Sequence, residues 1–215
     1  MSGRCNPRNP YVGAYPWLSE RAGIWSEIAR YVLRDAPRAR VVLELGAGYC
    51  DFINNVEAET RIAFDLNPEM VRFAAPGVDL RIGDCRGLPG IGAASLDLVF
   101  ASNFLEHFTV AEATGLLRDV HRTLRPGGRL ILLQPNYARN QAHYWDDPTH
   151  KTAFHHRNLP WLLSANGFRV VRMEPGLLPF SMKSRLPKSP LLVRWYLRSP
   201  FRPLAAQMYA VAERN

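Results

Sequence analysis

A glycine-rich stretch preceded by an acid is the first place where this 215-residue sequence could do chemistry. Gly46 and Gly48 let a ligand approach the backbone closely, and Glu44 stands two residues before the first glycine. The dinucleotide fingerprint would require a third glycine where the chain has Asp51. Because Glu44 would also repel a pyrophosphate, the stretch disfavours NAD and favours a ligand with a positive charge.

Two further polar positions follow short apolar runs. Asp65 ends one run, at a place suited to hydrogen bonds with ribose hydroxyls. Asp84 and Cys85 follow the next run, where they could receive the edge of an adenine ring.

Histidines supply the candidate general bases. His107 follows a fourth apolar run, and four of the six histidines lie in residues 143–156. His107 could instead only pack or cap a helix start. A metal site of Asp146, Asp147 and His150 has suitable ligand types but no diagnostic spacing, so we predict no metal. We favour substrate binding or general-base catalysis by His150 or Asp147.

Predicted strands must position these residues. Apolar runs indicate strands at residues 41–45, 61–65, 78–82, 96–100, 129–133, 168–173 and 207–213. Residues 110–125 and 159–165 favour helices. Strands separated by helix-length segments indicate an α/β fold with a doubly wound, mostly parallel sheet. Ligands of such sheets bind at the carboxyl ends of the strands, where the candidate residues lie.

Five motifs follow one another along residues 40–173, at residues 41–48, 64–65, 83–85, 102–107 and 124–128. In content and order they resemble the motifs of class I S-adenosylmethionine-dependent methyltransferases. The resemblance implies a Rossmann-like, seven-stranded sheet with an antiparallel last strand, and S-adenosylmethionine as cofactor. The family often has a further glycine at position 50, where this chain has Cys50.

Position by position, the resemblance implies a set of cofactor-binding residues. They are Glu44, Gly46 and Gly48 for the methionine part, Asp65 for the ribose, Asp84 and Cys85 for the adenine, and Leu66 and Asn103 as further cofactor contacts. There are structural alternatives for several of them. Glu44 could be a strand-end acid, Asp65 a helix cap, and Cys85 a small buried hydrophobe.

Sulfonium methyl transfer is a direct displacement, so positioning supplies most of the catalysis. A hydroxyl acceptor also needs a base, and His107 and His150 are the candidates. Residues 147–151 and the segment up to Phe168 look like a subset of bacterial methyltransferases associated with glycan and sugar-containing metabolites. The expected reaction is therefore methyl transfer to oxygen or nitrogen of a small molecule of that class.

The net charge of +8 would by itself suggest a nucleic-acid partner. However, residues 41–175 carry 13 basic and 15 acidic side chains, whereas residues 176–204 carry six basic and no acidic ones. The excess of positive charge lies in the segments on either side of residues 41–175. We therefore expect a small-molecule acceptor and no nucleic-acid partner, and the acceptor would be anionic if the basic segment contacts it. The rival functions are an RNA methyltransferase and a scaffold that binds S-adenosylmethionine without methylating, such as a cyclase or a pathway chaperone.

The chain divides into an N-terminal segment, residues 1–40, and a methyltransferase domain, residues 41–215. Aromatic residues at 11–17 are expected to cover the cofactor as a lid, with Tyr15 as a substrate contact, or to pack on the core. Residues 176–206 form a basic, proline-rich insertion before the last strand.

Arg194 and Arg198 of the insertion share one helical face beside apolar residues. This segment could rest on an anionic membrane, hold a phosphorylated or lipid-linked substrate, or be a solvated loop. No run of eighteen apolar residues exists, the N-terminus lacks a signal-peptide core, and three cysteines are too few for a disulfide framework. We therefore expect a cytoplasmic protein, peripheral at the inner membrane face if the insertion binds lipid; the sequence leaves the oligomeric state open.

Overall fold

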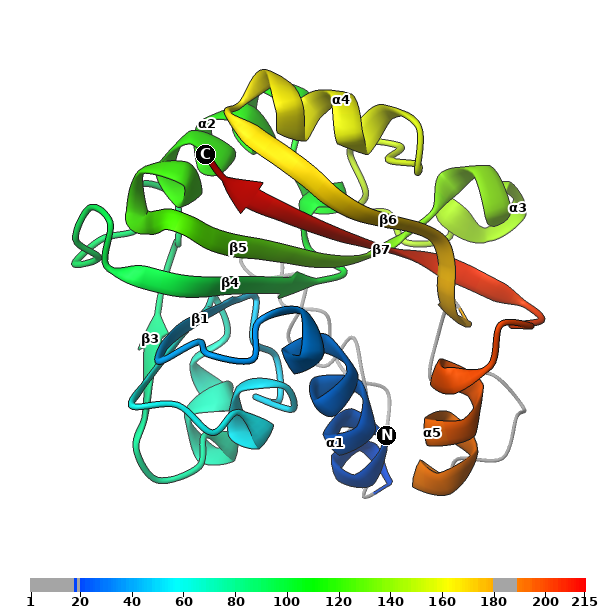
Figure 1. The fold of residues 1–215 in the computed structure, drawn as a ribbon, viewed down its shortest axis with the longest axis horizontal. Coiled ribbons are helices and arrows are strands. Elements are labelled where there is room, and N and C mark those ends of the chain that lie inside the picture. Colours follow the sequence, from blue (N-terminus) through cyan, green and yellow to red (C-terminus); the bar gives the residue numbers. More distant parts are fainter. Residues whose placement is uncertain (1–17, 19, 180–188) are drawn as a thin grey trace.

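The computed structural model describes residues 18, 20–179 and 189–215, which form a seven-stranded sheet with helices on both faces (Figure 1). The strands are β1 (Val41–Leu45), β2 (Thr60–Asp65), β3 (Val78–Ile82), β4 (Leu96–Ser102), β5 (Leu124–Pro135), β6 (Phe168–Pro179) and β7 (Ala205–Arg214). Their order is β3-β2-β1-β4-β5-β7-β6. Neighbours among β1 to β5 pair in parallel, and β7 is antiparallel to both β5 and β6. The predicted Rossmann-like sheet with an antiparallel last strand is confirmed.

The helices sort into two layers. They are α1 (Arg21–Val32), α2 (Val110–Thr123), α3 (Gln141–Tyr144), α4 (Asn158–Ala165) and α5 (Pro190–Arg198). Figure 1 shows α1 and α5 on one face of the sheet and α2 and α4 on the other. Each face has its own hydrophobic cluster, one including the buried side chains of α2 and α4 and one including those of α1 and α5.

The local sequence explains where helix α2 begins and which of its faces is buried. Its first turn has a reciprocal capping box, in which Thr109 accepts from the Glu112 amide and Glu112 accepts from the Thr109 amide. Ala113, Leu116 and Val120 are buried at helical spacing. The helix expected over residues 110–125 is therefore confirmed, except that it ends at Thr123 and β5 begins at once.

The connections between the first four strands are less helical than the predicted βαβ pattern. Helix-length segments there fold as short 3₁₀ turns, at Ile53–Asn55 and Pro68–Phe73. Asn67 caps the second turn by accepting from the Glu69 amide. Other 3₁₀ turns lie at Leu33–Asp35, Leu105–His107 and Tyr137–Arg139.

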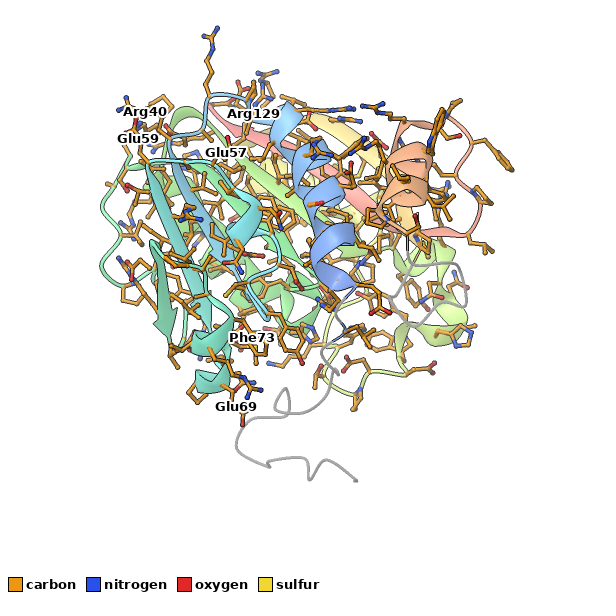
Figure 2. All side chains as sticks on the ribbon, turned by 90° about the horizontal axis from the view of Figure 1, so that it is seen from below. Arg40, Glu57, Glu59, Glu69, Phe73 and Arg129 are labelled. Atoms are coloured by element: carbon orange, nitrogen blue, oxygen red, sulfur yellow. The ribbon has the colours of Figure 1, made fainter. Side chains whose placement is uncertain are left out.

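The predicted insertion is partly regular structure. β6 extends to Pro179, and α5 lies beside α1 in Figures 1 and 2. A Cβ atom on Gly23 of α1 would lie 2.7 Å from Cγ of Pro190, so these two helices approach closely there. Arg194 is engaged within the molecule, donating to Glu27 of α1 at 2.9 and 2.6 Å, whereas Arg198 is exposed. In the described part of the chain, no helix is long and apolar enough to span a membrane.

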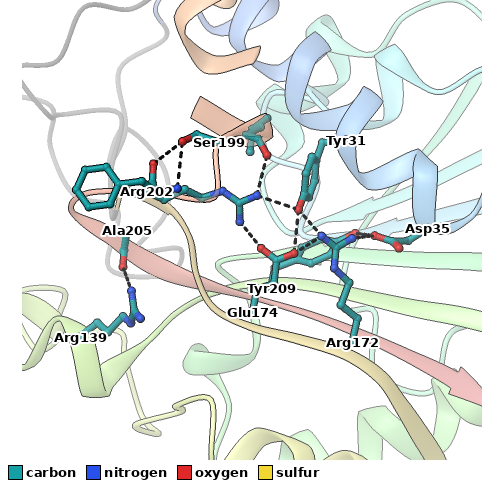
Figure 3. A network of polar contacts seen from close by, with 11 residues as sticks. Tyr31, Asp35, Arg139, Arg172, Glu174, Ser199, Arg202, Ala205 and Tyr209 are labelled. Carbon is teal, nitrogen blue, oxygen red and sulfur yellow. Dashed lines mark hydrogen bonds and ion pairs between the residues drawn. The ribbon is translucent and has the colours of Figure 1, made fainter. Parts of the chain in front are cut away.

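A polar network joins strands β6 and β7 to helix α1 and the 3₁₀ turn that follows it (Figure 3). Its members are Tyr31, Asp35, Arg172, Glu174, Arg202 and Tyr209. Glu174 accepts from the Tyr31 hydroxyl at 2.9 Å and forms ion pairs with Arg172 and Arg202. Asp35 accepts from Arg172 at 2.8 Å. The two acids and the two arginines thus neutralise one another. Arg202, from the predicted insertion, stabilises the fold through its ion pair with Glu174.

Candidate functional site

The carboxyl ends of the parallel strands bring the predicted residues to one edge of the sheet. Leu45 on β1 pairs with Phe64 on β2 and Ala101 on β4, and Asp65 pairs with Ile82 on β3. The segments that follow these four strands therefore begin side by side. The loop after β2, which carries Glu69 and Phe73, lies at the end of the molecule opposite Arg40 and Arg129 (Figure 2).

Glu44 is a buried acid near the carboxyl end of β1. Its residue is 3% exposed, and its Oε2 accepts from the Ile53 amide at 3.0 Å. Burial raises the pKa of Glu44 well above its usual range, and the charges of Asp51 and Asp65 add to this effect. A cationic group of a ligand beside Glu44 would offset that cost.

The glycine loop adopts the left-handed backbone that its glycines permit. Gly46 has φ +68° and Gly48 has φ +51°. A Cβ on Gly46 would lie 2.5 Å from the Phe104 ring, but a Cβ on Gly48 would meet nothing within 4 Å. Open space therefore lies beside Gly48. Cys50, which stands where the family often has glycine, also has a positive φ of +58°.

The loop is held in place from two directions. Asp65 accepts from the Gly48 amide at 2.7 Å and from the Asn67 amide at 2.8 Å. Burial raises the pKa of Asp65. Asp51 forms an ion pair with Arg21 at 2.6 Å, which ties the start of α1 to the glycine loop. Sequence reasoning missed Arg21, because the contact spans thirty residues and has no local signal.

The two residues predicted after β3 have different surroundings. The Asp84 carboxylate is about half exposed and pairs with Arg86 at 2.5 Å, which lowers the pKa of Asp84. Cys85 is buried in the hydrophobic cluster on the α2 face. Burial raises the pKa of Cys85 to about 12, so its side chain is a neutral thiol. Leu66, after β2, is 51% exposed, which is unusual for a leucine next to buried strands.

Asn103 follows β4 in a left-handed conformation, with φ +47°. Its Oδ1 accepts from Nε2 of Gln207 at 2.6 Å, so the loop after β4 is bonded to the start of β7. Gln134 on β5 accepts from the Phe104 amide at 3.0 Å. Both glutamines are buried, and sequence reasoning missed them because neither belongs to a motif.

The two predicted histidines come together although they are 43 positions apart in the sequence. The ring centroids of His107 and His150 lie 5.1 Å apart. Oγ1 of Thr149 lies 2.9 Å from Nδ1 of His107 and donates to Asp147 at 2.5 Å. Asp147 is therefore linked to His107 through Thr149. Burial, followed by the charge of His150, lowers the pKa of His107, so its imidazole is neutral near pH 7.

Glu106 completes this cluster, and sequence reasoning did not nominate it. It is 1% exposed, and neither of its carboxyl oxygens has a hydrogen-bond partner. Its Oε1 lies 4.0 Å from Nε2 of His150. Burial raises the pKa of Glu106 to about 8. The backbone oxygen of Glu106 accepts from the amides of Lys151 and Thr152, which fixes the histidine segment to the loop after β4.

Two residues predicted from the sequence are not part of this cluster. Asp146 bonds His143 at 2.9 Å, and both side chains are 70% exposed, so Asp146 is not grouped with His150 as the alternative metal site required. Tyr15 and the expected lid at residues 11–17 lie outside the described residues.

Comparisons with known proteins agree with this geometry. Residues 43–132 match the sequence model of a family described as "Methyltransferase domain". A malonyl-[acyl-carrier protein] O-methyltransferase of Dechloromonas aromatica is 38% identical over 100 residues, which are 44% of this chain and 37% of that protein. The chain thus spans little more than a third of that relative's length.

Solved structures show the same fold. A SAM-dependent methyltransferase of Archaeoglobus fulgidus superposes with a TM-score of 0.62 at 22% identity, covering 88% of this chain and 94% of that one. The [4+2]-cyclase SpnF superposes with a TM-score of 0.63 at 16% identity, covering 88% and 80%. Residues 43–132 thus match a methyltransferase domain, and the described chain has the fold of these solved proteins. The Archaeoglobus fulgidus protein is described as SAM-dependent, so S-adenosylmethionine is the cofactor that the domain match and the fold indicate.

The residues at the carboxyl edge fit that cofactor. Glu44 is a buried carboxyl beside which the positively charged amino group would be favourable, and Gly48 leaves open space. Each carboxylate oxygen of Asp65 accepts one backbone amide and retains capacity for a hydroxyl donor.

Proposed function

We propose that this protein transfers the methyl group of S-adenosylmethionine to an oxygen or nitrogen atom of a small-molecule acceptor, with sugar-containing metabolites as the acceptor class. The observation that carries this proposal is that the predicted cofactor loop and the histidine cluster lie close to each other in the fold. The glycine loop after β1 and the His107–His150 pair after β4 and β5 lie at the same edge of one parallel sheet. The sugar class rests on the loose resemblance of residues 147–151.

In this proposal the cofactor is held by the residues that follow the first four strands. Glu44 takes the amino group, Gly46 and Gly48 the methionine chain, and Asp65 the ribose diol. Leu66, with its exposed side chain, packs on the adenine, and Asp84, Cys85 and Asn103 complete the rim. The bound cofactor supplies an electrophilic methyl on a sulfonium, so the protein contributes mainly alignment of acceptor and cofactor.

The histidine cluster prepares an acceptor hydroxyl. His107 is the better candidate base, because its lowered pKa keeps the imidazole neutral and able to accept a proton near pH 7. Asp147 orients His107 through Thr149. His150 is a second candidate and is held by the backbone of Tyr144 at 2.6 Å. Tyr15 remains the proposed substrate contact from the N-terminal segment.

Release of S-adenosylhomocysteine tests the proposal. Purified protein is incubated with S-adenosylmethionine and a panel of sugar, amine and carboxylate acceptors that includes a malonyl thioester, the acceptor class in the relative's name. His107→Gln and His150→Gln should each lower turnover by about 10²-fold or more while cofactor affinity stays unchanged. His143→Gln is the matched control, since that histidine is exposed and away from the cluster.

Two outcomes would replace the proposed reaction. Cofactor binding without product release from any acceptor would favour the scaffold alternative, which the fold permits because the cyclase SpnF shares it. Release only with RNA would favour an RNA methyltransferase.

We also propose that the surface around α5 contacts an anionic membrane. Leu191, Trp195, Phe201 and Leu204 are each more than 60% exposed. Of the arginines in this region, Arg194 and Arg202 pair with Glu27 and Glu174, so exposed Arg198 supplies the free positive charge among the described residues of the segment. Sedimentation with vesicles tests this: Trp195→Ser should reduce binding to anionic vesicles, and equal sedimentation of both proteins would contradict it.

A further inference from the structure

The loops after β4 and β5 assemble a group of side chains that can bind a metal ion. Glu106, His107 and His150 each offer one ligand atom, and these atoms all lie within 4.8 Å of one another. Within the described residues, no other group of three such ligands is as close. Two of the three come from consecutive positions in the 3₁₀ turn after β4, and the third comes from the loop after β5.

The carboxyl of Glu106 lacks what a buried acid needs. Neither oxygen has a hydrogen-bond partner, and the side chain is 1% exposed. A buried carboxylate left without partners is costly, so it is protonated or neutralised by a nearby cation. The Nε2 atom of His150 lies 4.0 Å from Oε1 of Glu106, beyond hydrogen-bond distance. A cation between these two atoms would satisfy both.

His150 is oriented as a metal-binding histidine. Its Nδ1 lies 2.6 Å from the backbone oxygen of Tyr144. Because a carbonyl only accepts, the proton sits on Nδ1, and Nε2 directs its lone pair toward Glu106. Tyr144 is itself buried and fixed, since its hydroxyl donates to the Thr152 oxygen at 2.7 Å and accepts from the Phe154 amide at 3.2 Å. A backbone acceptor behind the ligand is the usual support of a metal-bound imidazole.

His107 has comparable support. Thr149 contacts its Nδ1 at 2.9 Å and is backed by Asp147. Rigid rings on both sides of Glu106 mean that a metal ion would not have to order the histidines on binding.

We propose that Glu106, His107 and His150 form a binding site for a divalent transition metal ion, with Zn²⁺ as the preferred ion. Two imidazoles and one carboxylate suit zinc, whereas Mg²⁺ prefers all-oxygen sets. Zinc bonds to such ligands are about 2.0–2.2 Å long, so two ligand atoms of a tetrahedral site lie about 3.3–3.6 Å apart. The 4.0 Å separation of Glu106 Oε1 and His150 Nε2 would close by about half an ångström when the ion binds. The widest pair, at up to 4.8 Å, would close by more than about 1 Å.

Three protein ligands leave a coordination position open. With the ion bound, the lone pairs of His107 and His150 lie on the metal, so the ion would replace these imidazoles as the activating group. An acceptor hydroxyl bound at the open position would then lose its proton to solvent more readily, since a bound metal lowers the pKa of its oxygen ligands. This role deepens the proposed function and rests on it, but metal binding itself does not.

Metal binding is tested on the full chain without cofactor or acceptor. Protein stripped with a chelator is titrated with Zn²⁺ against a chromophoric competitor, and Co²⁺ is used as a spectroscopic substitute. We expect one equivalent of zinc and the visible bands of tetrahedral Co²⁺. Glu106→Gln and His150→Gln should each weaken zinc binding by at least about tenfold. His143→Gln, a change at an exposed histidine, should bind as the wild type does.

Thermal melting of the metal-free variants shows whether each is folded. Glu106→Gln removes a buried carboxyl whose oxygens have no hydrogen-bond partner, so this variant should fold at least as well as the wild type. Substoichiometric zinc in the wild type, or equal affinity in Glu106→Gln, would overturn the site. Because neither assay measures methyl transfer, a protein that binds zinc but transfers no methyl contradicts the proposed function alone.

Discussion

Buried acids have opposite surroundings in two regions of the molecule, at strands β6 and β7 and at the carboxyl ends of the parallel strands. At β6 and β7, Glu174 and Asp35 are held by arginine and tyrosine partners (Figure 3). At the carboxyl edge, Glu44 and Glu106 are more deeply buried, yet within the described residues no arginine or lysine pairs with either. The fold gives Glu174 and Asp35 basic partners, whereas Glu44 and Glu106 have none among the described residues.

Because an unbalanced buried acid costs stability, its retention calls for a partner that arrives later. Glu27 and Glu44 allow the same comparison between two residues of one type, a buried glutamate with basic partners and one without. Both are about equally buried, at 5% and 3% exposure, but Arg194 and Arg30 lower the pKa of Glu27, whereas burial raises that of Glu44. The first has its counter-charge in the fold, and we expect the second to find it in the ligand.

Glu44→Gln should have the largest effect of the variants that separate the two regions. We expect affinity for S-adenosylmethionine to fall by about 10- to 100-fold, the loss of one charge-assisted hydrogen bond. The variant should melt no lower than the wild type at neutral pH, because the raised pKa means that ionised Glu44 destabilises the empty protein. Titration calorimetry and thermal melting measure the two quantities. Unchanged affinity would remove Glu44 from the cofactor site.

Glu27→Gln should behave in the opposite manner. It loses the paired hydrogen bonds from Arg194, so we expect Tm to fall by about 2–4 °C or more, with cofactor affinity unchanged within about twofold. The pKa of Glu27 is lowered to about 2. The stabilisation is therefore complete above the unfolded-state pKa of about 4.5 and is lost as pH falls toward 2. Melting curves of both proteins should converge over that range, and a constant difference would contradict the ion pair.

Glycine substitutions sharpen the picture of the cofactor loop. Gly46→Ala places a methyl 2.5 Å from the Phe104 ring and also strains the backbone, so it should lower stability more than Gly48→Ala. Gly48→Ala meets open space and should cost only the left-handed backbone penalty, about 1–2 kcal/mol. It should also weaken cofactor binding, since the methyl enters the space beside the loop. Equal melting points for the two variants would contradict the geometry.

The smallest effects concern the two arginines of α5. Arg194→Gln should lower Tm because Glu27 keeps only Arg30 as its partner, whereas exposed Arg198→Gln should change stability by less than about 0.5 kcal/mol. Denaturant unfolding of both variants tests this. Equal stabilities would show that Arg194 is no more engaged than Arg198.

Periodic and short-range signals predicted most of the fold. All seven strands appear where apolar runs predicted them. A buried strand needs several apolar residues close together in the sequence, so its signal is local. The helical content of the connections between early strands was overestimated, since segment length does not reveal that Asn67 caps its own turn or that Asn54 accepts from the Ala75 amide 21 positions away. Similarly, β5 begins at Leu124 and includes the glycines at 127 and 128, ahead of the strand predicted at residues 129–133.

The site was predictable only in part. His107 and His150 were found by residue type, and the structure brings them together. Glu106 is adjacent to His107 in sequence, but its complete burial depends on packing from distant segments. The pairing of Arg194 with Glu27 spans 167 positions and has no local signature.

Cys50 has a consequence for chemical selectivity. A thiolate is a strong nucleophile toward an activated methyl group, whereas a thiol is not. Burial, together with the charge of Glu44, raises the pKa of Cys50 to about 12, and Cys85 has a similarly raised value. At pH 7 only about one thiol in 10⁵ is ionised at either position. The acids and apolar walls that shape this edge therefore also protect the protein from methylating itself.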